Sequence, residues 1–407
     1  MPAPILLLAF RYPPFNRIGA YRWSKLSGRL ARLGHEIDVL CAPWPAAEDP
    51  GWFRDVEHER IRIHRVHSSY PHQLRSAQPE HRFLQKAHGK IFRWLDRLTP
   101  PHDIASLWGL RLRPAAELAL ASYASRPVMI ATGAPFSANY WAARIKQRHP
   151  DIKLIQDFRD PWLTSEAEFS SSPWARRFRT ATREANLLVS VTPEMTALFQ
   201  RLSGHARVAT VPNGVDLSGI RGALAGAVER FDFAYTGNLY NGREEPLAAF
   251  LSWIRQKREA SAGPRVVIAG TYPSRLGDTH RDLIESGNLS LEPHLPQARA
   301  FELLASSRIA LHLNGPGALA TFQTTTKLVE HAALGRPTLS VNYGGATHDF
   351  IRSRHLGWSL RADSASLFAE LDACLAAPRD FDFDVSDFDF DSTARLYSAL
   401  IDELAKA

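Results

Sequence analysis

The stretch Thr324–Val341 reads Thr-Thr-Thr-Lys-Leu-Val-Glu-His-Ala-Ala-Leu-Gly-Arg-Pro-Thr-Leu-Ser-Val, and it decides the fold. Its pattern predicts a polar loop, a short helix, a Gly-Arg-Pro turn and an apolar strand. Glycine after the last helical residue is the usual helix stop, and proline cannot continue the helix. The stretch is therefore one step of an alternating helix and strand series, which is the signature of an α/β protein.

The start of the predicted helix also predicts a ligand site. Lys327 and Glu330 are three residues apart, so they share one face of the helix. Thr325 and Thr326 supply hydroxyls at its N-terminus, where free backbone N–H groups attract phosphate. This arrangement predicts contacts to a phosphate and to a sugar hydroxyl of one ligand. The alternative is a capped surface helix with an exposed ion pair.

The same alternation of strand and helix signals runs through the whole chain. Short apolar runs, typical of strands buried on both faces, are separated by segments of helical spacing. Such strands pair in parallel through right-handed crossovers. A break near Asn213 divides the series in two, which predicts two doubly wound, Rossmann-like domains facing an interdomain cleft. The predicted strands cover residues 5–10, 35–40, 62–66, 128–131, 153–156, 187–191 and 208–211, then 231–235, 265–269, 309–313 and 337–341.

Composition indicates a globular protein without membrane spans. The chain has 407 residues, of which 45% are hydrophobic and 22% charged, as in proteins with large cores. Cys41 and Cys374 stand far apart, which points to a reducing compartment and to no metal site. Residues 5–10 predict a buried strand and not a signal peptide. We therefore expect a cytoplasmic protein, at most peripheral on the inner face of the membrane.

The net charge of +7 is concentrated in the first half of the sequence, where Lys and Arg outnumber Asp and Glu. This excess predicts an anionic partner, unless it reflects codon bias alone. Residues 83–98 have the pattern of a basic amphipathic helix, suited to an anionic membrane surface or to docking on its own domain. No nucleic-acid-binding motif is present, so we expect no nucleic acid partner.

Residues 380–391 alternate Asp with Phe. The Asp-x-Asp pattern fits a metal site, but no nucleotide motif stands beside it, and we predict a linker without metal. Residues 392–406 have the spacing of a final helix. The sequence has neither G-x-G-x-x-G nor a P-loop, which argues against dinucleotide-dependent redox chemistry and ATPase activity.

The segment around Lys327 and Glu330 resembles the donor-binding helix of nucleotide-sugar-dependent glycosyltransferases of the GT-B fold, in particular glycosyltransferase family 4. The resemblance covers residues 1–69 and 127–360 best. It implies a Rossmann-like acceptor domain over 1–213, a donor domain over 214–391, and a final helix, 392–407, that packs back on the first domain. It also implies that Glu330 binds the donor ribose.

A second donor segment follows the first strand of the second domain. Residues 235–246 contain Gly237, Asn238 and Arg243, and an arginine can bind a diphosphate through two N–H groups. In the family this loop supplies an arginine, which Arg243 matches, and often a lysine, whose part Lys327 would take. Family members often have a further glutamate where Phe322 stands here, so the resemblance does not identify the sugar.

The first domain offers one donor-binding candidate, Gly19, and the acceptor-side candidates. Gly19 follows the first strand and predicts a close approach of backbone to phosphate, as in the glycine-rich loop of the family. Ser137, Asp157, Arg159 and Asp160 follow apolar strands, where α/β proteins keep their chemistry. The block Asp157–Trp162 resembles one that lines the acceptor side of the cleft. The alternative is a buried ion network that holds a loop.

These residues predict a retaining glycosyltransferase that moves a sugar from a nucleoside diphosphate sugar to an acceptor hydroxyl. Arg243, Lys327 and Glu330 are the expected catalytic residues, with no metal and no cofactor. The acceptor would be a glycan, a lipid-linked glycan or a small molecule, in surface polysaccharide or glycoconjugate synthesis. The alternatives are a nucleotide-sugar epimerase or hydrolase on the same fold, and a catalytically silent binding module.

Overall fold

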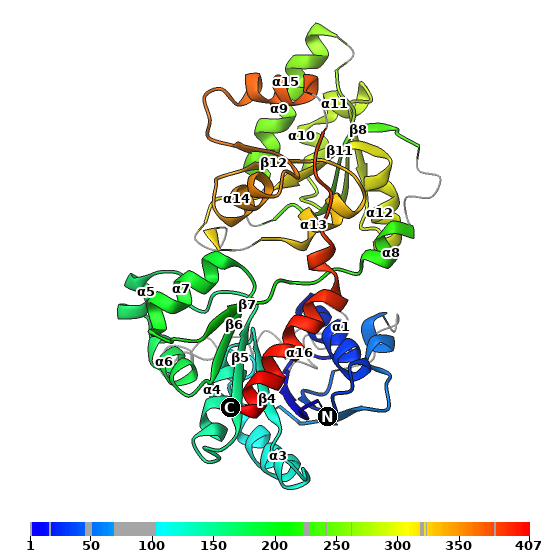
Figure 1. Cartoon of the computed structure of the whole chain (residues 1–407). Helices are drawn as coiled ribbons and strands as arrows, with labels where there is room; N and C mark the ends of the chain where they lie inside the picture. Colours follow the sequence, from blue (N-terminus) through cyan, green and yellow to red (C-terminus); the bar gives the residue numbers. More distant parts are fainter. Residues whose placement is uncertain are drawn as a thin grey trace, which may run out of the picture. The chain divides into compact units, whose positions relative to one another are not determined.

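The computed structural model describes residues 2–15, 18–44, 51–68, 103–222, 228–240, 242–261, 263–317, 321–322, 324–377 and 380–407. The predicted basic helix over residues 83–98 lies outside this part of the chain. The chain divides into two compact units (Figure 1). The first unit comprises Met1–Asn213 with Phe390–Ala407, and the second comprises Gly214–Asp389.

A parallel sheet forms the centre of the first unit. Within the described residues it has seven strands in the order β3-β2-β1-β4-β5-β6-β7. The order reverses direction between β1 and β4, so the loops after these two strands diverge there and leave room for a ligand. The strands are β1 Ile5–Leu8, β2 Ile37–Cys41, β3 Ile61–Arg65, β4 Val128–Gly133, β5 Lys153–Phe158, β6 Leu187–Ser190 and β7 Val208–Thr210.

The second unit repeats this plan. Its sheet, again counted over the described residues, has six parallel strands in the order β10-β9-β8-β11-β12-β13. The order reverses between β8 and β11, which places the expected ligand site at the carboxyl ends of these strands. The strands are β8 Phe231–Asn238, β9 Val266–Thr271, β10 Leu289–Glu292, β11 Ser307–Leu313, β12 Thr338–Asn342 and β13 Gly357–Arg361.

Helices connect the strands of both sheets. In the first unit they are α1 Ile18–Arg32, η1 Gly51–Val56, α3 Gly109–Ala121, α4 Ser137–Lys146, α5 Glu166–Ser171, α6 Ala175–Arg183, α7 Pro193–Ser203 and α16 Phe390–Lys406. In the second unit they are α8 Leu217–Arg221, α9 Glu244–Ala260, α10 Leu276–Thr279, α11 Arg281–Glu285, α12 Gln297–Ala305, α13 Thr326–Ala333, α14 Ala346–Ser353, α15 Leu367–Ala376 and η6 Ser386–Phe388. No helix among the described residues is long and apolar enough to cross a bilayer.

Both faces of each sheet are buried, which explains the continuous apolar runs. In β1, Ile5 and Leu7 belong to one core cluster and Leu6 and Leu8 to another. Side chains alternate between the faces of a strand, so a strand covered on both sides needs apolar residues at every position. The prediction of two doubly wound α/β domains is confirmed by this arrangement.

The C-terminal segment contributes residues to both units, with residues up to Asp389 in the second unit and Phe390–Ala407 in the first. The Asp-Phe segment, residues 380–389, packs through its phenylalanines, with Phe388 edge-on to Phe350 at 5.3 Å and Phe381 edge-on to Trp358 at 4.7 Å between ring centroids. The alternating pattern thus reflects one apolar and one solvated side of an irregular segment that ends in η6. Helix α16 then lies beside α1 (Figure 1) and buries Tyr397 in the first core.

Candidate functional site

The second unit brings most of the predicted donor residues to the switch point of its sheet. Strand β8 leads into α9, and α13 follows β11. Because β8 and β11 are neighbours, the segments after them meet at one edge of the sheet. Gly237 and Asn238 end β8, Arg243 immediately precedes α9, Thr325 caps α13, and Thr326, Lys327 and Glu330 lie in the first two turns of α13.

Lys327 reaches from α13 to the end of β8. Its Nζ donates to the Thr236 carbonyl oxygen and lies over the ring of Tyr235, 5.3 Å from the centroid. A Cβ atom on Gly237 would lie 1.9 Å from this Nζ, and Gly237 has a φ of +136°. Position 237 therefore requires glycine, both for its backbone conformation and for the room that the amine occupies.

Arg243 adds a second positive charge beside this amine. Its Nη1 donates to the carbonyl oxygen of Asn238 at 3.2 Å, so the side chain folds back over the loop that joins β8 to α9. Arg243 is close enough to contribute to the lowered pKa of the Lys327 amine. We call Arg243, Lys327 and Glu330 the donor cluster.

The donor cluster is partly desolvated, and this changes its acid–base behaviour. Burial lowers the pKa of Lys327 to about 8, opposed by Glu330 and assisted by Arg243. Burial also raises the pKa of Glu330, although Lys327 and a hydrogen bond with Thr326 act in the opposite direction. An anion placed beside the two cations would relieve their repulsion, so the cluster favours a negatively charged ligand.

The start of α13 has the predicted geometry for an anion site. Thr325 is the N-cap, and its hydroxyl accepts a hydrogen bond from the backbone N–H of Lys327 at 3.3 Å. Other N–H groups of the first turn have no partner within the helix. They add a partial positive charge next to the Lys327 ammonium group.

His312 belongs to the same site, although the sequence analysis did not single it out. It is the next-to-last residue of β11 and is 5% exposed. Burial holds the pKa of His312 well below its usual value, and the nearby His331, Lys327 and Arg243 add to this. The sequence did contain one indication of this residue, a histidine that interrupts an apolar strand close to its carboxyl end. A polar group buried there costs free energy unless it has a partner.

In the first unit, Asp157 holds structure together, which argues against the acceptor-side role predicted for it. The side chain is fully buried in the sheet. Its carboxylate accepts hydrogen bonds from Arg22 Nη2 at 3.2 Å, Trp23 Nε1 at 2.9 Å, Thr132 Oγ1 at 2.9 Å and the Tyr397 hydroxyl at 3.3 Å. These donors enclose the carboxylate, so the alternative of a buried ion network holds for Asp157.

Arg159 also holds structure together and does not point its donors at a ligand. Its Nε donates to the Gly133 carbonyl at 3.0 Å, Nη1 to Gly19 at 2.8 Å and Nη2 to Ala134 at 2.8 Å. Burial lowers the pKa of its guanidinium group. Arg159 thus ties the segment after β1 to the loop after β4 at the switch point. Gly19 lies in the first turn of α1 and not in the loop that the sequence predicted.

Ser137 is likewise a structural residue. It starts α4 and is fully buried, with its Oγ 2.8 Å from Ser106 Oγ and its backbone N–H donated to Asp103 Oδ2 at 2.9 Å. A ligand therefore cannot reach it without displacing these partners. Asp160, directly after β5 and only partly buried, remains an acceptor-side candidate.

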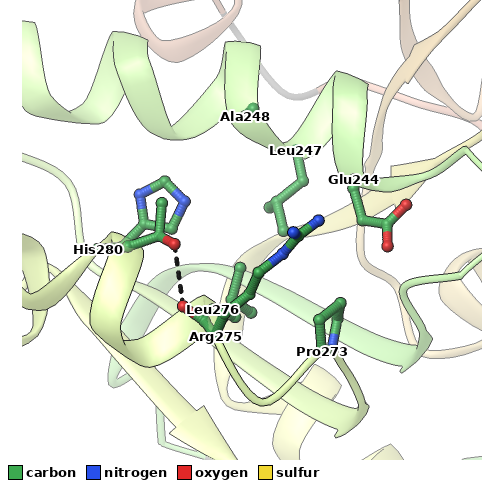
Figure 2. A pocket seen from close by; sticks show the side chains of 8 residues that line it. Glu244, Leu247, Ala248, Pro273, Arg275, Leu276 and His280 are labelled. Atoms are coloured by element: carbon green, nitrogen blue, oxygen red, sulfur yellow. Dashed lines mark hydrogen bonds between the residues drawn. The ribbon is translucent and has the colours of Figure 1, made fainter.

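A cavity of about 320 Å³ lies beside the start of α9. Figure 2 shows its lining, which combines the apolar Leu247 and Leu276 with the charged Glu244 and Arg275. Glu244 directly follows Arg243, yet no residue of the donor cluster lines the cavity. The cavity is therefore a neighbour of the donor cluster and not a part of it. Within the described residues, no three His, Cys, Asp or Glu side chains are grouped as metal ligands.

Two long stretches of the chain match known families. Residues 19–214 match the family described as Glycosyl transferase 4-like domain, and residues 243–382 match the family described as Glycosyl transferase-like. Together with the two Rossmann-like sheets, these matches define the chain as a glycosyltransferase of the GT-B class. Within that class it resembles glycosyltransferase family 4, as the sequence predicted. No curated protein matches the chain significantly in sequence.

Solved structures share the fold over nearly the full chain. An α,α-trehalose-phosphate synthase (UDP-forming) from Burkholderia vietnamiensis superposes with a TM-score of 0.64, at 11% identity and with 100% of each chain covered. HepE from Anabaena in complex with UDP gives 0.58 at 12% identity, covering 99% of this chain and 96% of HepE. The UDP-GlcNAc 2-epimerase from Methanocaldococcus jannaschii gives 0.54 at 11% identity and 98% of each chain. Identities this low show the fold alone.

Proposed function

We propose that the protein transfers a sugar from a nucleoside diphosphate sugar to an acceptor hydroxyl, with retention of the anomeric configuration. The donor cluster carries the proposal, because it places two cations and a carboxylate at the switch point of the second sheet. HepE in complex with UDP and with UDP-glucose supports a nucleotide-sugar donor for a protein of this fold.

Each residue of the donor cluster then has a role in catalysis. Negative charge grows on the leaving diphosphate, and pre-positioned cations in a partly desolvated site stabilise it more than water does. Arg243, Lys327 and the N–H groups at Thr325 and Thr326 would provide this stabilisation. Glu330 would accept hydrogen bonds from the ribose hydroxyls. We propose no metal and no cofactor, because the two cations supply the charge that a metal ion would supply.

Gly237 and Asn238 would complete the donor site. The absence of a side chain at Gly237 leaves space for Lys327, and the Asn238 carbonyl orients Arg243. In the first unit, the backbone at Gly19 would approach the phosphates. Asp160 is the acceptor-side candidate that its partial exposure supports.

The acceptor and location follow from the charge distribution. The basic first half supports an anionic acceptor or surface, such as a lipid-linked glycan of a growing surface polysaccharide. We propose that the enzyme works in the cytoplasm or at the inner face of the membrane, without a nucleic acid partner. A small-molecule acceptor is compatible with the same donor site.

A thermal-shift panel tests the donor site. UDP, GDP, ADP, CDP and dTDP would be added as free nucleotides and as sugar conjugates. A ligand at 100 times its Kd stabilises the folded state by about 2.7 kcal/mol, so one nucleotide family should raise the melting temperature. Lys327→Ala should remove the shift. Lys257→Ala is the matched control, because Lys257 lies in the last turn of α9 and pairs with Asp372 at 2.6 Å.

The outcomes separate the candidate functions. A flat panel, or an equal shift in Lys327→Ala and the wild type, would contradict the donor site. Once a donor is known, its consumption without acceptor would indicate an epimerase or hydrolase. Binding without any turnover across acceptors would leave a silent module.

A further inference from the structure

His312 lies at the centre of the switch point of the second sheet. Ala310 of β11 is paired with Ala234 of β8, so two residues further on His312 is level with Thr236. The Thr236 carbonyl is the group that holds Lys327 Nζ. On its other side, His312 is paired with Ser340 of β12. His312 therefore lies on β11, next to β8, whose Thr236 carbonyl accepts a hydrogen bond from the Lys327 amine.

The side chain of His312 faces helix α13. Side chains two residues apart on a strand lie on the same face. Ala310 belongs to the core cluster that contains Val329 and Ala332 of α13, so His312 also points to the face that α13 covers. This is the helix that carries Lys327 and Glu330.

A chain of hydrogen bonds fits a neutral His312 ring with its proton on Nε2. Asn342 Nδ2 donates to Ser340 Oγ at 2.9 Å and to Ser359 Oγ at 2.8 Å. The Ser340 hydroxyl then has its own proton to donate, and His312 Nδ1 lies 3.0 Å away. When Nδ1 accepts, the proton of a neutral imidazole is on Nε2. Nε2 has no hydrogen-bond partner among the described residues.

We propose that His312 is a further contact for the donor diphosphate: Nε2–H donates to a phosphate oxygen, and the ring takes up a proton as the anion binds. This inference rests on the proposed function, since it assumes that the diphosphate lies at the donor cluster. It follows from a histidine that is only 5% exposed and whose Nε2 has no partner among the described residues, at the point where two cations converge.

Proton uptake follows from the charges around the ring. Helix α13 presents Lys327, Glu330 and His331, the loop before α9 presents Arg243, and β12 presents the neutral Ser340. Burial, together with these cations, lowers the pKa of His312 and keeps the imidazole neutral in the free protein. A bound diphosphate offsets them with negative charge, so the protonated ring becomes the favoured form.

Two substitutions separate the hydrogen bond from the proton uptake. His312→Gln places an amide N–H near the position of Nε2, but the amide cannot take up a proton. His312→Asn keeps a polar group near Nδ1 for Ser340 and removes the Nε2 donor. His331→Asn is the matched control, because His331 is a second buried histidine on this face, with Nδ1 3.1 Å from Thr338 Oγ1. Thermal unfolding of each variant checks that it folds.

Calorimetric titration with inorganic pyrophosphate measures both effects without knowledge of the nucleotide base. Titrations at about pH 7, in buffers of different ionisation enthalpy, give the protons taken up on binding; Lys327, with a pKa of about 8, is largely protonated there. We expect the wild type to take up as much as about one proton more than His312→Gln. His312→Asn should also bind about tenfold more weakly. His331→Asn should retain the uptake of the wild type.

Nitrogen NMR of the free protein gives a test that needs no ligand. The His312 ring should be neutral at about pH 7, with its proton on Nε2, because burial lowers its pKa well below the usual value. Two results would overturn this inference and leave the proposed function intact. One is a proton on Nδ1 of the free protein. The other is unchanged pyrophosphate affinity and proton uptake in both His312 variants, while Lys327→Ala abolishes binding. Pyrophosphate binding that does not need Lys327, or no binding to the wild type, would remove both.

Discussion

Replacing Asp157 with alanine should strongly destabilise the first unit. The carboxylate lies in β5 and compensates the guanidinium group of Arg22, which is itself only 3% exposed. It also accepts a hydrogen bond from Tyr397 of α16, so it joins the last helix to the sheet. Alanine removes all of these acceptors and leaves a charged side chain without its counter-ion inside the protein.

The size of the effect can be worked out from the remaining partners of Arg22. Breaking a buried ion pair by removing one partner costs about 3–5 kcal/mol. Arg22 keeps the carbonyl oxygens of Pro212 at 2.7 Å and Val211 at 3.0 Å, which favours the lower end of that range. The loss of an acceptor for Tyr397, Trp23 and Thr132 adds about 1 kcal/mol each. We expect a loss of about 6 kcal/mol, or roughly 15 °C in melting temperature for a unit of this size.

Urea unfolding followed by tryptophan fluorescence would measure the change. Trp23 packs edge-on against Tyr397 with 5.2 Å between ring centroids, so its emission reports on this region. Tyr397→Phe should cost about 1 kcal/mol, because it removes a single hydroxyl group. Asp151→Ala is the control in the same unit and should cost less than about 1 kcal/mol, because its ion pair with Arg126 is exposed.

A small effect would refute the reasoning. If Asp157→Ala unfolded at nearly the urea concentration of the wild type, the carboxylate could not be the counter-ion of a buried arginine. If acceptor turnover were then lost in the stable variant, the acceptor-side role predicted from the sequence would return.

Three further changes test other parts of the structure. Gly237→Ala should weaken nucleoside diphosphate binding at least about tenfold in a calorimetric titration. The new Cβ would lie 1.9 Å from the present position of Lys327 Nζ and would push the amine away. An unchanged Kd would contradict this geometry. The affinity for nucleoside diphosphate should fall as the pH rises through about 8, because Lys327 then loses the charge that attracts the anion. In Lys327→Met, Kd values measured from about pH 7 to 9 should change much less with pH. If they change as steeply as in the wild type, another group causes the pH dependence. Phe388→Ala should destabilise the second unit by about 3 kcal/mol in chemical denaturation, because it removes a packed aromatic ring. Asp384 is exposed, so Asp384→Ala should cost less than about 1 kcal/mol. Equal losses would argue against apolar packing of the Asp-Phe segment.

The elements that the sequence predicted well are those whose signals are local. A short helix was expected within Thr324–Val341, and α13 runs Thr326–Ala333, because its threonine cap and its glycine stop stand beside it in the chain. Strands β10 and β13 were missed. They are the two edges of the second sheet and are partly exposed, so they lack the continuous apolar run that identified the central strands.

The candidate site divides in the same way. Lys327 and Glu330 could be paired from their spacing alone, since one helix determines their common face. Asp157 and Arg159 could not be assigned, because a carboxylate or guanidinium after a strand has the same local pattern whether it meets a ligand or a buried partner. His312 was overlooked because a single histidine in an apolar strand gives no indication of the groups that it faces.

The sequence by itself determined the alternation of strands and helices, the caps of α13 and the burial of each central strand, because these depend on neighbours within a few residues. The tertiary structure decided which polar groups meet. Asp157 and Tyr397 are 240 residues apart in the chain, and Lys327 and Thr236 are 91 apart. Such pairs depend on strand order and on the return of α16, and no short-range pattern records them. Tertiary packing therefore made Asp157 a buried counter-ion and placed His312 beside the donor cluster.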